Sequence, residues 1–270
     1  MKVTSPMSDN QAISSRFINF VRTGPRGRAP VVLVHPVGLD LSYWGEQIEA
    51  LCDDHDVIAF DLPGHGRTPG SPADWTLAKS ADMLAQVIRS TGAESAHVVG
   101  LSVGGMISQA LALAQPILVR SLSLIDTAAT FSEEGRAGMR KRAKMASEEG
   151  MQAVVPSTIQ RWFTPETVAR RPDIIDRVSK TLLADDPLVH AAMWNMISTL
   201  NLVSHLPRVS CPTLVLVGEL DPSSPPSAAR VLQESIMGAQ MHVIPNTSHM
   251  APLEKPDVVN GYLTDFLKNI

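Results

Sequence analysis

Short apolar runs that resemble buried strands alternate with helical patterns along most of this chain. Four of the runs are rich in β-branched residues and end in turn residues, as strands covered on both faces do. They are Val31–Val34, Val57–Phe60, His97–Val99 and Leu214–Val217, with Leu122–Ile125 and His242–Ile244 as weaker examples. This alternation predicts an α/β fold with a mostly parallel central sheet and helices on both faces.

The expected helices lie between the strand candidates. They cover Leu41–Leu51, Leu77–Ser90, Gly105–Ala114, Ala228–Ile236 and Val258–Lys268. Ahead of the first strand, Arg16–Arg22 has the pattern of an antiparallel ribbon that enters the sheet.

One stretch breaks the alternation. Residues 131–205 contain helical patterns, punctuated by Gly150, Pro156, Pro165 and Pro187, and no convincing strand. An insertion at the carboxyl edge of a parallel sheet lies above the place where open α/β sheets bind ligands. We therefore predict a core made of residues 1–130 and 206–270, with an all-helical cap at residues 131–205.

Composition excludes several classes of function. With 270 residues, 44% hydrophobic and 19% charged, the chain can bury a full core. A net charge of −4 without a basic block argues against nucleic acid or an anionic membrane as the partner. The first fifteen residues lack an apolar leader segment and no run is long enough to span a bilayer, so we expect a cytoplasmic protein. Cys52 and Cys211 have no metal spacing and are interpreted as reduced thiols, and no metal or cofactor is expected.

The sequence Gly100-Leu101-Ser102-Val103-Gly104 directly follows the strand His97–Val99 and precedes a predicted helix. A G-x-S-x-G sequence between a strand and a helix is typical of a nucleophile elbow. The serine there has a strained backbone, and glycines two residues to either side leave room for the neighbouring strand and helix. Ser102 is the candidate nucleophile.

A serine hydroxyl needs a base to react at neutral pH. His249 lies in the loop after the last strand candidate, which returns to the carboxyl edge of the sheet beside Ser102, and is the candidate base. Five other histidines lie within or beside predicted helices and strands, where a structural role is favoured. They are His55, His97, His190, His205 and His242.

The third member of a triad is a carboxylate that orients the imidazole. Asp221 follows the strand Leu214–Val217 and gives the chain order Ser102, Asp221, His249, which α/β-hydrolases have. Asp126 competes for this role, because it ends the strand Leu122–Ile125 at the same edge of the sheet. Glu219 is nearer to its strand but two positions early. Asp221 is favoured, and the alternatives stay open at this point.

An oxyanion hole needs two N–H donors aimed at the developing negative charge. Val103, the residue after the nucleophile, supplies one. The other is expected from the turn His35-Pro36-Val37-Gly38, and because Pro36 has no N–H the donor is Val37. The run Asp61–Arg67 has glycine spacing but no phosphate-binding motif, so a structural turn is favoured, with a structural role for His65.

Five segments together resemble the α/β-hydrolase superfamily over essentially the whole chain. They are HPVGLDLSYW (35–44), DLPGHGRT (61–68), GLSVGG (100–105), GELDPSSPP (218–226) and SHMAPLEKP (248–256). More narrowly, GLSVGGMISQALA, VRSLSLIDTAA and Arg161–Pro165 are similar to the 3-oxoadipate enol-lactonase branch. Pro36 and Asp126 depart from that branch, where many relatives carry glycine and asparagine.

The resemblance implies a serine hydrolase that cleaves a small, carboxylate-bearing enol-lactone or ester from aromatic catabolism, through an acyl-enzyme and without a cofactor. The same triad would also serve an amidase, a general carboxylesterase, a C–C bond hydrolase or a cofactor-free perhydrolase. A ligand-binding protein that kept the fold is the alternative outside enzymology. The sequence says nothing of the oligomeric state.

An anionic substrate needs a cation in its pocket, because an unpaired buried anion is costly. Arg161 stands beside Trp162 in the stretch most similar to the lactonases, so Arg161 is the candidate contact for the carboxylate and Trp162 an apolar wall. Five other cap cations fall on one acid-flanked helical segment, for which a solvated face is predicted. They are Arg136, Arg140, Lys141, Arg142 and Lys144.

Overall fold

The computed structural model describes residues 17–270, and its centre is a seven-stranded sheet in the order β1-β3-β2-β4-β5-β6-β7. Neighbouring strands are parallel throughout, except that β1 pairs antiparallel with β3. The strands are β1 (Phe20–Thr23), β2 (Val31–Val34), β3 (Val57–Phe60), β4 (Ala96–Leu101), β5 (Val119–Ile125), β6 (Thr213–Gly218) and β7 (Gln240–Ile244). The predicted mostly parallel sheet is confirmed. Of the predicted ribbon, Arg16 lies outside the described residues, as do residues 1–15.

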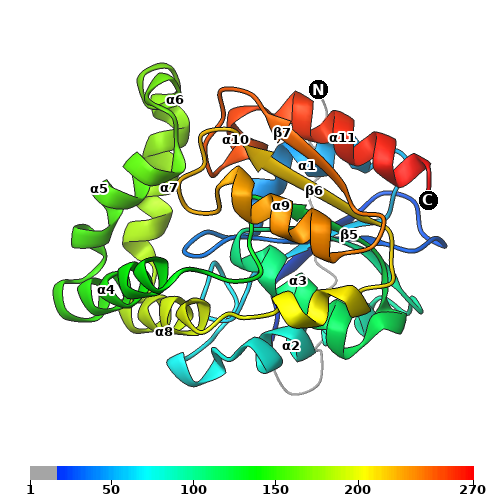
Figure 1. The fold of residues 1–270 in the computed structure, drawn as a ribbon, viewed down its shortest axis with the longest axis horizontal. Coiled ribbons are helices and arrows are strands. Elements are labelled where there is room, and N and C mark those ends of the chain that lie inside the picture. Colours follow the sequence, from blue (N-terminus) through cyan, green and yellow to red (C-terminus); the bar gives the residue numbers. More distant parts are fainter. Residues whose placement is uncertain (1–16) are drawn as a thin grey trace.

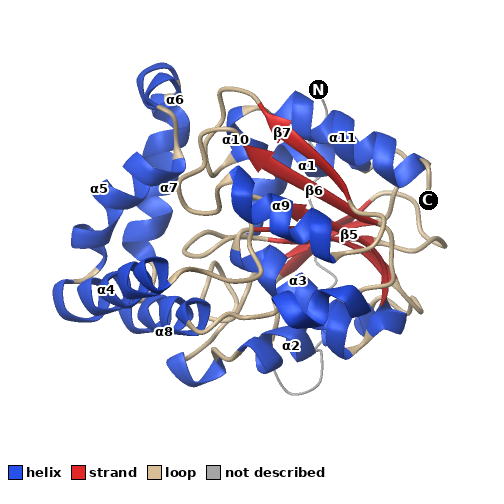
Figure 2. Ribbon diagram, in the orientation of Figure 1, coloured by secondary structure: helices blue, strands red, loops and turns tan. Residues whose placement is uncertain are grey.

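Helices cover both faces of this sheet (Figure 2). On one face α1 (Gly45–Leu51) packs against α11 (Pro256–Lys268). On the other face α2 (Leu77–Ser90) packs against α3 (Val103–Ala114), and α9 (Pro226–Ser235) lies against β6 and β7. Strands β2 and β3 are buried at every position, which agrees with the continuous apolar runs that predicted them.

Five helices lie between β5 and β6 in the sequence and gather beyond one end of the sheet (Figure 1); we name them the cap. They are α4 (Glu133–Glu149), α5 (Met151–Trp162), α6 (Pro165–Arg170), α7 (Pro172–Ala184) and α8 (Pro187–Ser198). Helices α4 and α8 pack against each other. Pro165, Pro172 and Pro187 each occupy the first helical turn, where the missing N–H costs nothing, so these prolines start helices and separate them.

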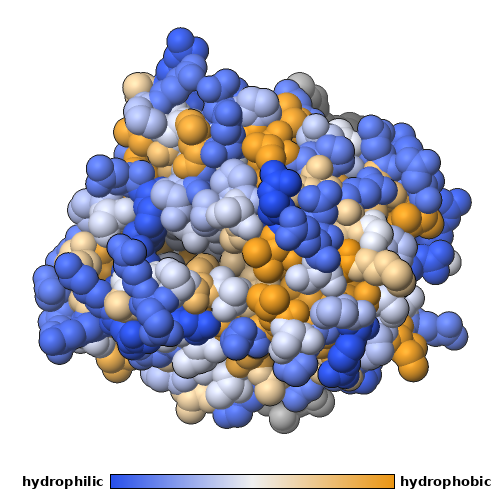
Figure 3. All heavy atoms as spheres, viewed as in Figure 1, coloured by the Kyte–Doolittle hydropathy of each residue, from blue (hydrophilic) through white to orange (hydrophobic). Residues whose placement is uncertain are grey.

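The cap packs closely on two turns of the core, at Gly38 and Gly64. A Cβ on Gly38 would lie 2.6 Å from Leu182 and 3.1 Å from His190, and a Cβ on Gly64 would lie 2.7 Å from Val189. Both glycines also have positive φ. The surface of the cap is mainly hydrophilic in the view of Figure 3. Among residues 17–270, no helix combines the length and apolar character needed to cross a membrane.

Candidate active site

Ser102 sits at the turn between β4 and α3 with φ 55° and ψ −118°, a strained conformation for a residue with a side chain. The two flanking glycines permit it. A Cβ on Gly100 would lie 2.5 Å from the backbone of Gly104, and a Cβ on Gly104 would lie 2.1 Å from the Val34 carbonyl oxygen. The strand–turn–helix arrangement expected for a nucleophile elbow is therefore present, and the close packing explains why the sequence needs glycine there.

The structure brings together the three side chains predicted as a triad. His249 Nε2 lies 3.0 Å from Ser102 Oγ, and His249 Nδ1 lies 2.8 Å from Asp221 Oδ2. A carboxylate can only accept, so Nδ1 carries the proton and Nε2 is left to accept the hydrogen of the Ser102 hydroxyl. All three residues are buried. The second oxygen of Asp221 accepts from the amides of Ser223, at 2.7 Å, and Ser224, at 3.1 Å, which fix the carboxylate in place.

The competing carboxylates have other partners. Asp126 is fully buried with φ 45°, and its two oxygens accept from the amides of Gly218, at 2.8 Å, and Ala251, at 3.0 Å. Burial, followed by the nearby Asp221 carboxylate, raises the pKa of Asp126 well above its usual value. Glu219 accepts from the amide of Asn246 at 2.9 Å. Asp126 thus ties the ends of β5 and β6 to the segment after His249 and does not touch the imidazole.

The backbone amides of Val37 and Val103 lie on the turn after β2 and at the start of α3. These two segments are in close contact, because Gly104 packs on the carbonyls of Val34 and His35. Within the described part of the chain no group accepts a hydrogen bond from either amide. Both donors are free for an oxyanion, and the assignment of the oxyanion hole to them stays a prediction.

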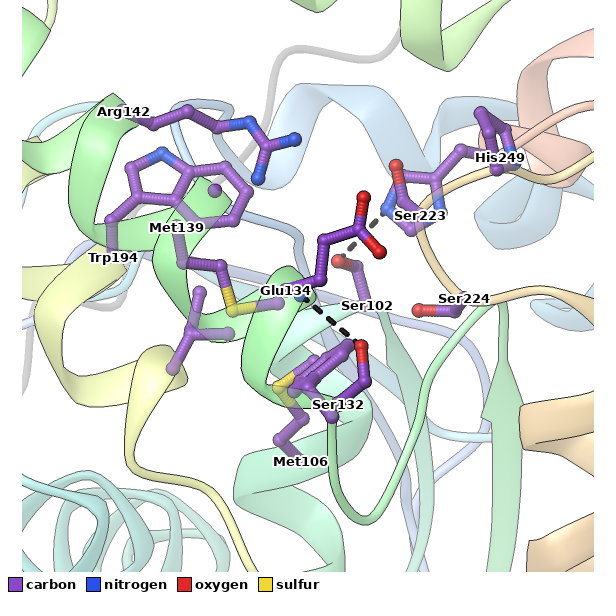
Figure 4. Close-up of a pocket in the computed structure, with 15 residues that line it drawn as sticks. Ser102, Met106, Ser132, Glu134, Met139, Arg142, Trp194, Ser223, Ser224 and His249 are labelled. Carbon is purple, nitrogen blue, oxygen red and sulfur yellow. Dashed lines mark hydrogen bonds between the residues drawn. The ribbon is translucent and has the colours of Figure 1, made fainter.

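A pocket of about 440 Å³ opens beside the Ser102–His249 pair, between the core and the cap. Its volume suits a small molecule. Figure 4 shows the side chains of Arg142 and Trp194 on the opposite wall from His249, with Glu134 between them. Apolar side chains complete the wall, namely Met106, Phe131, Met139 and Ile197.

A family model described as the alpha/beta hydrolase family matches residues 31–261, which cover strands β2 to β7, the elbow and the triad. The chain belongs to the alpha/beta hydrolase family. This hydrolase is 25% identical over 251 residues to 3-oxoadipate enol-lactonase 2 of Acinetobacter baylyi, with 93% of each chain covered. The resemblance predicted from the sequence is confirmed.

Solved structures give the same result. The fold of the hydrolase matches an enol-lactonase from Burkholderia xenovorans LB400 with a TM-score of 0.88 at 28% identity, covering 96% of this chain and 99% of that one. It matches a thermophilic esterase from Thermogutta terrifontis, solved with malate bound, with a TM-score of 0.87 at 32% identity, covering 93% of each chain.

The two predicted cap contacts of the hydrolase lie at the end of α5. Neither Arg161 nor Trp162 is among the described residues that line the pocket. Trp162 is buried with its ring 6.3 Å from the ring of His249, and the Arg161 carbonyl accepts a hydrogen bond from Ser248 Oγ at 3.2 Å. The end of α5 therefore packs against the His249 loop, and a contact of Arg161 or Trp162 with the substrate stays a prediction.

The solvated face predicted for the cap cations is correct for Arg140, Lys141 and Lys144, which are exposed. It is wrong for Arg136 and Arg142. The guanidinium of Arg136 donates to the carbonyl oxygens of Phe131, Ser198 and Leu200 and joins the two ends of the cap. Arg142 faces the pocket, since it lies on the same side of α4 as the buried Met139 and Ala146.

Glu254 has a role that the sequence did not reveal. One carboxylate oxygen accepts from the amide and hydroxyl of Thr164 and from the hydroxyl of Thr167, at 2.9, 2.8 and 2.6 Å. The other accepts from the amide of Ser248 at 2.6 Å. This single carboxylate joins the start of α6 in the cap to the residue before His249. Its place in segment 248–256, which resembles the α/β-hydrolase superfamily, was the signal that could have pointed to it.

The other buried histidines are held by structural contacts. His35 Nε2 accepts from the Leu62 amide at 2.9 Å, and burial followed by the nearby His65 lowers the pKa of His35 to about 3. His97 Nδ1 lies 2.9 Å from Ser121 Oγ, and burial lowers its pKa to about 4. Cys52 and Cys211 are free thiols, and no cluster of three or more metal-ligand side chains occurs in residues 17–270.

Proposed function

We propose that this hydrolase cleaves a small, carboxylate-bearing enol-lactone or closely related ester through an acyl-enzyme on Ser102. The observation that carries the proposal is the continuous buried chain from Asp221 through His249 to Ser102, at 2.8 and 3.0 Å, on a strained elbow. This arrangement supplies a nucleophile, a base with a fixed tautomer and a carboxylate that stabilises the imidazolium.

In the first step Ser102 Oγ attacks the carbonyl carbon while His249 Nε2 takes the hydroxyl proton. The amides of Val37 and Val103 then stabilise the oxyanion of the tetrahedral intermediate. As the intermediate collapses, the C–O bond to the leaving oxygen breaks and His249 returns the proton to that oxygen. Water, deprotonated by His249, hydrolyses the acyl-enzyme in the second half of the reaction.

A lactone places a particular demand on the pocket. Its leaving oxygen stays attached to the acyl chain when the ring opens, so the whole opened substrate remains in the site during hydrolysis. The pocket of about 440 Å³ is large enough for such a chain. An enol is also a better leaving group than an ordinary alcohol, because the charge of the departing enolate is delocalised, and conversion of the released enol to a ketone then opposes re-closure of the ring.

The substrate class is supported by the relatives. Both the Acinetobacter protein and the Burkholderia structure are enol-lactonases, and the Thermogutta esterase was solved with malate, a small dicarboxylate. A role in aromatic catabolism and a cytoplasmic location belong to the same proposal. The partner is a small molecule.

The proposal is tested by a panel of enol-lactones, simple lactones, esters, amides and C–C cleavage substrates, assayed with the wild type and with Ser102→Ala. A serine-directed fluorophosphonate should label the wild type on Ser102 and leave the alanine variant unlabelled. The enol-lactone should give the highest kcat/KM. Near wild-type turnover by Ser102→Ala would overturn the mechanism, and preference for an amide would overturn the substrate class.

A further inference from the structure

Two arginine side chains from different cap helices lie against one indole ring. The guanidinium carbon of Arg142, on α4, is 5.1 Å from the ring centroid of Trp194 on α8, and that of Arg161, at the end of α5, is 5.8 Å from it. Cation–π contact of this kind favours both placements but does not neutralise either charge.

Neither guanidinium has an anionic partner. Among the described residues no carboxylate lies within ion-pair distance of Arg142 or Arg161. The Nε and Nη2 atoms of Arg161 are buried without any acceptor, and its Nη1 has only a long contact of 3.5 Å to the Ser157 carbonyl. Burial, followed by the nearby charge of Arg142, lowers the pKa of Arg161 to about 9. Two half-buried guanidinium groups without an anionic partner are costly to hold close together, so the pair favours the binding of an anion.

The place for that anion is the pocket beside Ser102. Arg142 lines the pocket, and Figure 4 shows its guanidinium directed from α4 toward the pocket interior above Trp194. The only carboxylate in the described lining is that of Glu134, an exposed residue that forms no ion pair with either arginine. An anionic group can therefore reach Arg142 in the space that also gives access to the nucleophile.

The indole that carries the pair is itself fixed. Trp194 Nε1 donates to His190 Nε2 at 2.9 Å, and His190 Nδ1 lies 2.8 Å from Asp185 Oδ2. All three side chains are almost fully buried, so the ring cannot rotate without breaking this chain of hydrogen bonds. The arginines are thus presented on a rigid support, as a preformed binding site requires.

We propose that Arg142, Arg161 and Trp194 form the subsite for a carboxylate of the substrate, remote from the bond that Ser102 attacks. Arg142 makes the direct, bidentate contact with the carboxylate. Arg161, which lies against the same indole ring, contributes a second positive charge. The inference rests on the proposed function. It deepens that function by assigning the charged end of the substrate to α4, where the sequence placed it on Arg161.

The test compares two substrates that differ only in charge: a 4-nitrophenyl monoester of succinate, whose other carboxylate is free, and the corresponding methyl diester. Arg142→Met keeps the apolar stem and removes the charge. It should raise KM for the free acid by about 10- to 100-fold and leave kcat within about threefold, while KM for the diester hardly changes. Arg161→Met should give the same selectivity with a smaller rise, of about 3- to 10-fold. Arg140→Met, on the exposed side of the same helix, is the matched control.

Equal losses on both esters, or no loss on either, would overturn the subsite. Binding to a catalytically silenced protein separates this result from the proposed mechanism. In Ser102→Ala, titration calorimetry with glutarate should show binding that Arg142→Met abolishes and Arg140→Met leaves intact. If the wild type binds glutarate through Arg142 while Ser102 is neither labelled by the fluorophosphonate nor needed for turnover, the subsite is kept and the acyl-enzyme is rejected. If active enzyme does not bind glutarate, the subsite is rejected and the acyl-enzyme is kept.

Discussion

Asp61 in the core is a buried ionisable side chain and Arg161 in the cap is a half-buried one, and their surroundings differ. The Asp61 carboxylate accepts from the amides of Leu41 and Arg67 and from the Asn19 side chain, at 2.8, 2.8 and 2.7 Å. Two of the three nitrogens of the Arg161 guanidinium have no acceptor among the described residues.

The same contrast between core and cap holds for the other charged side chains around the active site. Asp126 and Asp221 are each held by two backbone amides, so the core side of the active site is complete in the absence of substrate. On the cap side of the pocket, Arg142 and Arg161 have no carboxylate partner among the described residues. The core therefore fixes the positions of the catalytic side chains. In the cap, the proposed subsite would select the substrate by its charge. The following predictions are ordered from the largest expected effect to the smallest.

The largest effect is expected at Asp221. Replacing it by Asn removes the charge that stabilises the imidazolium and favours the wrong tautomer of His249, so kcat should fall by about ten-thousand-fold. Asp126→Asn should lower kcat by less than about tenfold, because Asp126 contacts backbone amides and not His249. Steady-state kinetics of both variants decide between them. The reverse order would transfer the orienting role to Asp126.

The next effect is on stability in the core. Asp61→Ala leaves three donors without their acceptor and opens a void beside Gly66, whose Cα packs on the carboxylate. The free energy of unfolding should fall by about 3 to 5 kcal/mol. Urea unfolding monitored by circular dichroism measures it, with Asp265→Ala, near the C-terminus, as a control. A loss below 1 kcal/mol would mean that Asp61 does not hold the turn.

Acid should destabilise the core through His35. This histidine is buried in its neutral form with a pKa of about 3, while in the unfolded chain it titrates near 6.5. Between these values the unfolded state binds one more proton, so stability is full above pH 6.5 and falls as the pH decreases, by ~1.4 kcal/mol per pH unit from this group. His35→Gln should flatten the dependence of urea midpoints on pH, whereas the exposed His205→Gln should not.

The smallest effect has the opposite sign and lies in the cap. Arg161→Met replaces a half-buried cation, which has no anionic partner among the described residues, by a shorter apolar side chain, so the substrate-free protein should gain about 1 kcal/mol in unfolding free energy. Thermal unfolding with and without glutarate measures the gain and its reversal by ligand. A loss of stability in the absence of ligand would mean that Arg161 is satisfied by the protein, and the contrast between core and cap would fail.

Sequence patterns predicted the core more closely than the cap for physical reasons. Strands β2 and β3 are buried on both faces, and their predicted bounds coincide with the observed ones. Strand β7 is an edge strand with only Ile244 buried, so its apolar run was short and the prediction covered only its end. Helix α3 begins at Val103, two residues before the prediction, because the elbow turns directly into the helix.

The cap gave a weaker signal because the buried positions of its helices form no simple pattern: they are few on α4 and many on α8. Helix α4 buries only Met139, Ala143 and Ala146. Because the other positions carry many charges, the apolar side of this helix is hard to detect in the sequence. Arg142 lies three residues after Met139 and four before Ala146, so helical spacing would have placed it on the buried side. Trp194 carried no such signal, because the buried residues of α8 lie on several sides of the helix.

The acyl-enzyme tests the central claim most directly. A slow enol-lactone is mixed with the wild type, quenched in acid and examined by intact-protein and peptide mass spectrometry. Because the leaving oxygen stays on the opened chain, Ser102 should carry an adduct with the full mass of the lactone, and the adduct should be absent from Ser102→Ala and prolonged in Asp221→Asn. Turnover of the lactone with no adduct on Ser102 at any time, or with an adduct on another residue, would contradict the account.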